Sequence, residues 1–330
     1  MKVQRITLND IATLAGVTKM TVSRYLRTPE KVKPETARRI ASVIEEVGYQ
    51  PDPDNPAINS NAIERIGVLV PSFNNQIFAD LLAGVESAAA ARGYQTLVVN
   101  YDYDRQKEEE QIATVLAFNV KALLLTESVH SIRAEKYLRT ARIPVAEVMG
   151  LAKNPGRINV GFDNFRAGLD MTRMLLASGK RQIIYFGAMS DLRDEQRYAG
   201  YCQAMSDAGL SAGRIMPGKI SSVTMGTGMM TLARQMYPQM DGILCTNDDL
   251  AVGVLRECRA CGIQVPEQMA IAGFHGLEIG QVTTPRLASV LTPRFDMGKI
   301  ATELLIKKIN GLPAIERVDL HYQLSMGETI

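Results

Sequence analysis

The first fifty residues carry apolar positions at helical spacing, in three short groups separated by turn signals. Thr7 and Asp10 have the spacing of a capping box at the start of a first helix, which we expect to end at Leu14. Gly16 then allows the positive φ that a sharp turn between helices needs, and the small Ala12 lets two helices cross closely. The pattern predicts two short helices joined by a tight turn.

The second helix of this pair has a polar and basic outer face. Thr18 is a suitable N-cap, and the helix is expected to run through Arg24, with Val22 turned inward. A third helix is expected from Pro34 to Gly48. This arrangement predicts a helix-turn-helix whose second helix can enter a DNA major groove, and an ordinary αα-hairpin is the alternative. The outward positions of the second helix are Lys19, Met20, Ser23 and Arg24, and the apolar face of the third is Ala37, Ile40, Ala41, Ile44 and Val47.

From Ile66 onward, short apolar runs typical of buried strands alternate with longer helical patterns. Such βαβ alternation predicts parallel sheets covered by helices, after a Pro- and Asp-rich linker at residues 51–63. The expected strands are 66–70, 95–101, 122–126, 143–148, 182–188, 242–246 and 269–274; the expected helices are 78–93, 108–118, 133–141, 171–179, 196–209 and one from Asp248; and 159–164 is expected to be a crossing segment.

Two of these helices share a weak internal similarity. Residues 83–93 and 199–209 both begin with Ala-Gly, have Ala five residues later and end with Gly. We interpret the small residues as allowing each helix to pack closely on a sheet. The repeat favours two similar α/β lobes with a ligand cleft at the carboxyl ends of their strands.

Charge is distributed unevenly along the chain. Residues 1–50 contain nine Lys or Arg and five acidic residues, a net charge of +4, whereas the remaining 280 residues sum to −2. A basic head attached to a slightly acidic body is typical of a DNA-binding module joined to another function.

Composition and motifs exclude several other classes of protein. No apolar run is long enough to span a membrane, and the basic N-terminus lacks the apolar segment of a signal peptide, so we expect a cytoplasmic protein. The C-x-x-C formed by Cys258 and Cys261 lies in a helical pattern without further ligands, which favours packed thiols over a zinc site. Neither a dinucleotide-binding glycine motif nor a P-loop is present, so we expect no cofactor, no metal and no enzymatic activity.

Several motifs in order resemble the LacI/GalR family of transcriptional regulators over essentially the whole chain. They are TLNDIATLAGVTKMTVSRYL, GYQP, IGVLVPSFNNQIFADLLAGVE, VGFDN, TNDDLAVG, VPEQMAIAGF and LASVLTPRFDMG. Within the family, CTNDDLAVG and IAGFHGLEIGQ are most similar to the gluconate- and idonate-responsive regulators. The resemblance implies a homodimer that binds double-stranded operator DNA, with a core like periplasmic sugar-binding proteins and a small-molecule effector in its cleft.

The resemblance also implies the residues that contact DNA. Members of the family insert an apolar side chain from a short linker helix into the minor groove, and Ile58 occupies that position here. Two acidic residues, Asp52 and Asp54, stand where relatives carry a basic feature, so we expect this linker to add less affinity. Lys19, Met20 and Arg24 would face base edges, and Thr18, Thr21 and Ser23 would lie near phosphates.

Within the cleft, Arg197 matches the arginine that holds the effector in this family, and Asn247 matches a second ligand contact. The loop and helix after the first strand would add Phe73, Asn75 and Phe78, and Glu127 follows a strand end. For three of these a structural role is the alternative: Phe78 in the core, Glu127 paired with a surface cation and Asn247 as a helix cap.

His275 stands where most members of the family have an aspartate, and a second frequent acid is replaced around Met149 and Gly150. An aspartate accepts hydrogen bonds from a neutral sugar and repels a carboxylate, whereas a histidine can donate or carry positive charge. Loss of both acids, with Arg197 kept, favours an anionic ligand such as a sugar acid. A structural histidine is the alternative.

We therefore expect an effector-responsive regulator, a repressor of sugar-acid catabolism that senses gluconate, idonate or a related aldonate. A regulator of neutral-sugar metabolism, or a sugar-binding or sugar-modifying protein with the same core, is the alternative. The expected fold is a three-helix head followed by two α/β lobes with parallel sheets. The expected boundaries are 1–50 for the head, 51–63 for the linker, 64–162 with 293–325 for the first lobe, and 163–292 with 326–330 for the second.

Overall fold

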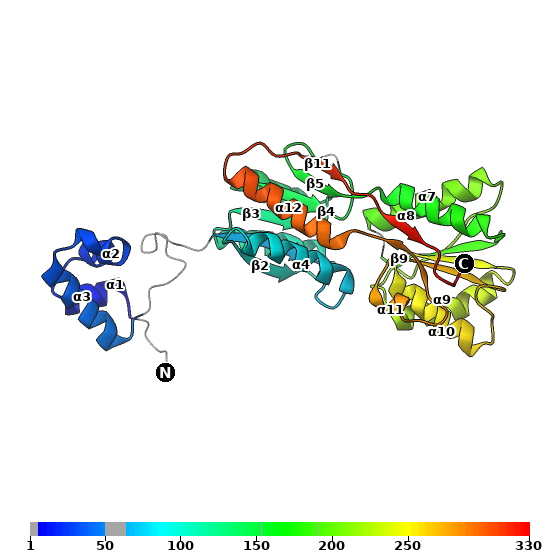
Figure 1. The fold of residues 1–330 in the computed structure, drawn as a ribbon, viewed down its shortest axis with the longest axis horizontal. Helices are drawn as coiled ribbons and strands as arrows, with labels where there is room; N and C mark the ends of the chain where they lie inside the picture. The colour runs from blue at the N-terminus through cyan, green and yellow to red at the C-terminus, as the bar shows by residue number, and fades with distance from the viewer. Residues whose placement is uncertain (1–5, 50–63, 153, 190) are drawn as a thin grey trace. The chain divides into compact units, whose positions relative to one another are not determined.

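The computed structural model describes residues 6–49, 64–152, 154–189 and 191–330 (Figure 1). The described chain divides into a head near the N-terminus and a larger core, and each is presented by itself. Ile58 and the other linker positions lie outside the described residues.

The head contains the three predicted helices, α1 (Leu8–Leu14), α2 (Lys19–Arg27) and α3 (Pro34–Val47). Thr7 and Asp10 form the predicted capping box of α1, and Gly16 and Gly48 adopt positive φ. Helix α2 extends three residues beyond the predicted end at Arg24, because the chain meets no helix breaker before Pro29, where the 3₁₀ turn η1 (Pro29–Lys31) begins.

Five side chains form the core of the head, and they come from all three helices. Ile11, Val22 and Ile40 are completely buried, one from each helix. Partly buried residues such as Tyr25 and Leu26 pack against this cluster, which is why α2 continues past Arg24. The five are Ile11, Ala12, Ala15, Val22 and Ile40.

The core contains two six-stranded sheets, as predicted for two α/β lobes. Strand order is β11-β5-β4-β3-β1-β2 in the first sheet and β12-β10-β9-β8-β6-β7 in the second. The ladders β1–β3, β3–β4 and β8–β9 are parallel, and the short β12 pairs with β10 in the antiparallel direction. The first sheet comprises β1 (Arg65–Val70), β2 (Gln95–Asn100), β3 (Ala122–Leu125), β4 (Val145–Val148), β5 (Ile158–Gly161) and β11 (Arg317–Asp319); the second comprises β6 (Ile183–Phe186), β7 (Gly213–Ile215), β8 (Gly242–Cys245), β9 (Ala270–His275), β10 (Ala288–Leu291) and β12 (Gln323–Ser325).

Helices accompany both sheets (Figure 1). The first lobe carries α4 (Gln76–Ala90), α5 (Arg105–Ala117), α6 (Ile132–Ala141) and α12 (Arg294–Ile309). The second carries α7 (Asn164–Ala177), α8 (Leu192–Asp207), α9 (Val223–Met236), α10 (Asp248–Ala260) and the short α11 (Glu278–Gln281). The expected crossing segment 159–164 is thus in part a strand, because its first residues complete β5 before the chain leaves the first sheet.

Within the part of the core that the structure describes, the chain crosses between the two lobes three times. It passes from β5 to α7, from β10 to α12, and from β11 to β12. We expected residues 293–325 to belong to the first lobe, but Ser325 and Leu324 pair with Ser289 and Val290 in the second sheet. The last crossing therefore occurs before Gln323.

Paired glycines allow the helices of each lobe to cross closely. A Cβ on Gly84 of α4 would lie 2.0 Å from the Phe295 carbonyl oxygen of α12, and a Cβ on Gly200 of α8 would lie 2.0 Å from the Phe165 carbonyl oxygen of α7. Gly84 and Gly200 are the glycines of the two Ala-Gly pairs noted in the sequence. For these two glycines the interpretation of helix-to-sheet packing was wrong, because they lie at helix–helix crossings.

The four cysteines are free thiols. Cys258 is buried but Cys261 is exposed, so the expectation of two packed thiols holds for only one member of the C-x-x-C. Within the described residues, no helix is long and apolar enough to cross a membrane, and no group of three or more His, Cys, Asp or Glu is arranged to hold a metal ion.

Candidate DNA-binding and effector-binding sites

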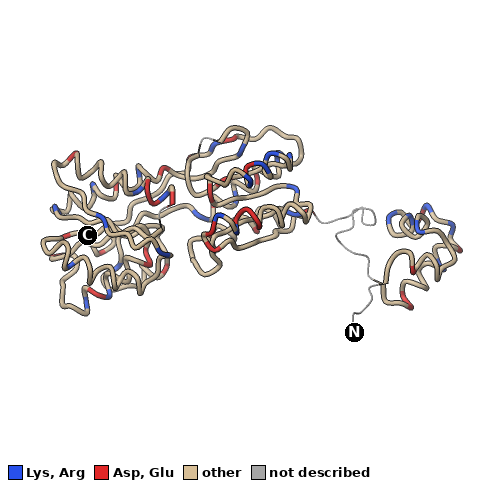
Figure 2. Tube along the Cα trace, turned by 180° about the vertical axis from the view of Figure 1, so that it is seen from behind, with Lys and Arg blue, Asp and Glu red and all other residues tan. Residues whose placement is uncertain are grey.

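Helix α2 presents a polar, positively charged surface on the head. Lys19, Met20 and Arg24 are exposed, whereas Val22 on the opposite side is buried. No acidic residue occurs in α2, and Arg27, which the sequence analysis did not single out, adds a further exposed cation near its end. The Lys and Arg positions can be followed in blue in Figure 2.

The hydroxyl groups at the start of α2 are held by its cap. Thr18 Oγ1 accepts from the Thr21 backbone N–H at 3.3 Å and lies 2.9 Å from Thr21 Oγ1. Both hydroxyls therefore lie at the N-terminus of a helix, where the backbone dipole favours an anion such as a phosphate. Ser23 is half-buried one turn further along.

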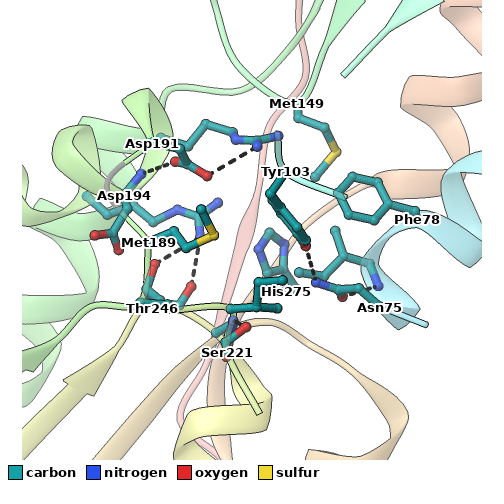
Figure 3. A pocket seen from close by; sticks show the side chains of 16 residues that line it. Asn75, Phe78, Tyr103, Met149, Met189, Asp191, Asp194, Ser221, Thr246 and His275 are labelled. Carbon is teal, nitrogen blue, oxygen red and sulfur yellow. Dashed lines mark hydrogen bonds and ion pairs between the residues drawn. The ribbon is translucent and has the colours of Figure 1, made fainter. Parts of the chain in front are cut away.

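The core contains a pocket lined by residues of both lobes, which encloses about 550 Å³ including the part open to solvent. In Figure 3, Asn75, Phe78 and Tyr103 of the first lobe face Asp191, Asp194 and Thr246 of the second. Most lining residues follow the carboxyl ends of strands, where open α/β sheets bind ligands. The lining comprises Asn75, Ile77, Phe78, Tyr103, Met149, Ala188, Met189, Asp191, Arg193, Asp194, Arg197, Ile220, Ser221, Thr246, Asn247 and His275.

Arg197 projects from α8 into this pocket and is 5% exposed. Its Nε donates to Asn164 Oδ1 at 2.8 Å and its Nη1 donates to the Thr246 carbonyl oxygen at 2.7 Å. The guanidinium lies over the Phe274 ring, 4.1 Å from its centroid. Burial is the main influence on the pKa of Arg197 and lowers it, but an arginine remains charged. The charged guanidinium is therefore held in place by neutral oxygen atoms and an aromatic ring.

His275, at the end of β9, is 3% exposed and has a φ of 97°. Burial, followed by the charges of Arg197 and Arg294, holds the pKa of His275 well below its ordinary 6.5. The imidazole is therefore neutral at pH 7, and the protonated form considered from the sequence does not arise. Its Nδ1 lies 3.2 Å from Thr292 Oγ1, which leaves Nε2 as the nitrogen available to a ligand.

Asn247 is a helix cap, the structural alternative considered from the sequence, and it also lines the pocket. Its Oδ1 accepts from the Leu250 N–H at 3.1 Å and so caps α10, while its Nδ2 donates to Ser221 Oγ at 2.6 Å in the pocket wall. Asn75 caps α4 in the same way and donates from Nδ2 to the Tyr103 hydroxyl at 3.0 Å. Phe78 is buried and also lines the pocket.

Two predicted contacts are not in the pocket lining. Phe73 is 61% exposed and lies outside the lining. Glu127 lines a smaller neighbouring cavity and pairs with Arg193, with 2.6 Å between Glu127 Oε1 and Arg193 Nη2. The cation that Glu127 pairs with is thus a pocket residue rather than a surface one.

Sequence reasoning missed Arg193, Asp191 and Tyr103. Arg193 precedes Arg197 by four residues on α8, a spacing that places both on one helix face and could have indicated it. Burial alone would raise the pKa of Asp191, but the charges of Arg193 and Arg197 and the hydrogen bonds that Asp191 accepts together lower it. Tyr103 follows β2 in a positive-φ turn and gives no comparable signal.

Residues 7–52 match the model of bacterial regulatory proteins of the lacI family, and residues 64–320 match that of periplasmic binding proteins and the sugar-binding domain of the LacI family. The chain belongs to the LacI family. This LacI-family protein is a DNA-binding transcriptional regulator, and the expectation of a regulator rather than an enzyme is confirmed by its relatives.

Individual relatives are similar to this chain over nearly its full length. The chain is 48% identical over 332 residues to the HTH-type transcriptional regulator IdnR of Escherichia coli strain K12, and equally so to the HTH-type transcriptional regulator GntR of that strain, covering 100% of each chain. The crystal structure of a Lacl family transcriptional regulator from Silicibacter pomeroyi is 30% identical, with a TM-score of 0.85, over 98% of this chain and 99% of that one. The predicted family and the predicted fold are both confirmed.

Proposed function

We propose that this regulator is a homodimeric repressor whose operator affinity is changed by a sugar acid, namely gluconate, idonate or a related aldonate. The observation that carries the proposal is the environment of Arg197. Its hydrogen bonds go to an amide oxygen and a backbone carbonyl, so no carboxylate of the described residues is bonded to the guanidinium. The carboxylate of an effector can be that partner.

His275 supports the same ligand. A neutral imidazole can donate from Nε2 to a carboxylate or hydroxyl oxygen, whereas an aspartate at this position would repel an anion. Asn75, Ser221 and Asn247 supply neutral donors and acceptors that suit the hydroxyl groups of an aldonate chain.

Two carboxylates in the pocket, Asp191 and Asp194, favour the alternative of a neutral sugar. Both are already paired with arginines, Asp191 with Arg193 at 3.2 Å and Asp194 with Arg214 at 2.9 Å. Asp194 also accepts from the Tyr185 hydroxyl at 2.7 Å. Each of the two carboxylates thus has an arginine within 3.2 Å, and the carboxylate of an effector is expected at Arg197 rather than beside them.

Calorimetry tests the effector with a matched pair of ligands. Gluconate and glucitol have the same carbon skeleton and differ in whether one end is a carboxylate or an alcohol. We expect gluconate or idonate to bind and glucitol to bind at least about tenfold more weakly, as for loss of a charge-assisted hydrogen bond. Arg197→Met should abolish the difference, and Arg173→Met, at an exposed residue of the same lobe, should retain it. Equal affinity for glucitol would contradict the proposal.

The dimer and the operator belong to the same proposal. A dimer would place two copies of α2 on two half-sites about one helical turn apart, or a multiple of it, which predicts a palindromic operator. Sedimentation of the full chain at micromolar concentration should give the mass of two copies. A monomer that still binds a palindromic site with unit stoichiometry would contradict this part.

A further inference from the structure

Arg193 occupies the wall between two cavities. It lines the effector pocket, and it also lines the smaller cavity that contains Glu127, Thr126 and Leu192. Its side chain is 11% exposed, so the guanidinium is largely removed from solvent. An arginine in this position needs fixed partners, because an unpaired buried charge is costly.

The partners of Arg193 come from both lobes. Nη2 donates to Glu127 Oε1 at 2.6 Å, and Nη1 donates to the Thr126 carbonyl oxygen at 3.1 Å. Thr126 and Glu127 follow β3 of the first sheet, whereas Arg193 lies in the first turn of α8 in the second lobe. One planar guanidinium thus makes hydrogen bonds to two adjacent residues of the opposite lobe.

The third partner, Asp191, is on the same lobe as Arg193. Its Oδ2 lies 3.2 Å from Nη2, and its Oδ1 accepts from the Asp194 N–H as the cap of α8. This contact lies within the second lobe, so it does not depend on the position of the first lobe. The contacts to Glu127 and Thr126 exist only while the lobes are together, so the orientation of Arg193 depends on closure.

Glu127 is itself held in place by Tyr101, a residue of its own lobe. The Tyr101 hydroxyl donates to Glu127 Oε1 at 3.3 Å and lies 3.1 Å from Thr126 Oγ1. Burial raises the pKa of Glu127, while the charge of Arg193 opposes that effect, as expected of a carboxylate held for a cationic partner.

We propose that Glu127 is a positioning residue that reaches across the cleft and fixes Arg193 in the wall of the effector pocket, so that lobe closure assembles the cationic side of the pocket. The effector then binds the closed arrangement better than the open one, which is the differential affinity that any allosteric response requires. The nature of the effector rests on the proposed function, but the contact across the cleft can be tested without any ligand.

The test is hydrogen exchange of the full chain in the absence of effector. In Glu127→Gln the backbone amides of residues 126–131 and those of residues 192–198 should both exchange about threefold faster or more, because an ion pair that joins the two segments is weakened. Arg193→Lys, which keeps the charge but cannot make two parallel contacts, should give a smaller effect in the same two segments.

Glu110→Gln is the matched control, since Glu110 is an exposed carboxylate of the same lobe that accepts only from Gln106 one turn away. Its exchange should equal that of the wild type in both segments. Faster exchange in Glu127→Gln that is confined to residues 126–131 would overturn the proposal, because the carboxylate would then support only its own loop.

Adding saturating gluconate separates the two proposals. Gluconate should slow exchange in both segments of the wild type, but only in residues 192–198 of Glu127→Gln. If gluconate protects neither segment of the wild type while the ligand-free result holds, the proposed effector is wrong and the role of Glu127 stands. Protection of both segments in Glu127→Gln would contradict the role of Glu127.

Discussion

Two arginines illustrate how environment determines what a single side chain can recognise. Arg197 is buried, fixed by Asn164, Thr246 and the Phe274 ring, and therefore directed at one position in the pocket. Arg24 is exposed on α2 and can adopt the geometry that a base edge requires. The first suits a small ligand of defined shape, and the second suits a guanine with acceptors at O6 and N7.

Replacing Arg24 by alanine should weaken operator binding by about 1–3 kcal/mol and relax specificity at one base position. Binding titrations at fixed salt, on a set of operators changed one base pair at a time, measure both effects. Arg38→Ala, at an exposed position of α3, should leave the order of preference unchanged. An equal loss at every sequence for Arg24→Ala would indicate a phosphate contact instead.

His130 should make stability depend on pH. Its side chain is fully buried, with Nδ1 2.9 Å from Glu108 Oε1 and Nε2 3.7 Å from Glu147 Oε1. Burial alone would lower its pKa, but the hydrogen bond to Glu108 and the two negative charges outweigh it and raise the pKa to about 9. Because the folded value exceeds the unfolded value of 6.5, the stabilisation is complete below about pH 6.5 and is lost as the pH rises through about 9.

The loss should amount to at most about 3.5 kcal/mol, since one pKa unit corresponds to about 1.4 kcal/mol. Urea unfolding between pH 6 and pH 10 measures it. His130→Gln should be less stable at pH 6 and should flatten the dependence, while His321→Gln, at an exposed position, should follow the wild type. A wild-type stability that rises between pH 7 and pH 9 would exclude this role for His130.

At the scale of elements, the helix crossings set the position of the effector residues. Gly168 and Gly200 let α7 and α8 approach so closely that a Cβ on Gly168 would lie 2.3 Å from the carbonyl oxygen of Arg197 itself. The packing of these two helices therefore fixes the backbone from which Arg197 and Arg193 project.

Gly200→Ala should destabilise the core by about 1–3 kcal/mol, because the new methyl group meets backbone rather than a flexible side chain. It should also weaken effector binding, since α8 must shift. Gly228→Ala on α9, where nothing lies within 4 Å, should be neutral or stabilising by up to about 1 kcal/mol. Chemical denaturation of both variants tests the pair, and equal effects of the two substitutions would contradict the packing argument.

The sequence predicted those elements whose signal is local. The three helices of the head were predicted nearly to the residue. Thr7, Gly16, Thr18 and Gly48 cap or end these helices through neighbouring backbone groups, so their effect can be seen in a short stretch of sequence. Strands β7, β10, β11 and β12 were not predicted as elements, since each has only three or four residues. Helices α9 and α12 were not predicted either. Gly84 and Gly200 stand out in the sequence as part of a repeat. The reason for the two glycines, close packing against α12 and α7, is visible only in the structure.

The residues of the candidate site likewise fall into those that the sequence could predict and those that it could not. Asn75 follows a strand end, which the alternation of elements locates, whereas Arg197 and Asn247 were predicted from the resemblance to the family. The placement of Glu127 behind Arg193 depends on how two lobes meet, and no pattern within either lobe encodes it. Phe73 was expected in the pocket because it lies in the loop after the first strand, where this fold places ligand contacts, but its side chain is 61% exposed.

At the scale of the whole molecule, effector binding should stabilise the core and not the head, because the two are separate compact units and the pocket belongs to the core alone. At a gluconate concentration 100 times its Kd, the core should gain about 2.7 kcal/mol against unfolding. Scanning calorimetry should then show the transition of the core shifted upward and that of the head unchanged. A shift of both transitions by the same amount would show that they unfold as one unit.

The positive φ at His275 has a consequence for how this family can change its ligands. At 97° the backbone lies outside the region that most side chains adopt, and among residues other than glycine it is Asn, Asp and His that enter positive φ most readily. The three residues that the main chain accepts most easily are therefore an acid, an amide and an imidazole, which differ mainly in charge and in the hydrogen bonds they offer. These residues can be exchanged without rebuilding the strand end, so under the proposed function a change between a neutral sugar and a sugar acid needs a new side chain at this position and no change of fold.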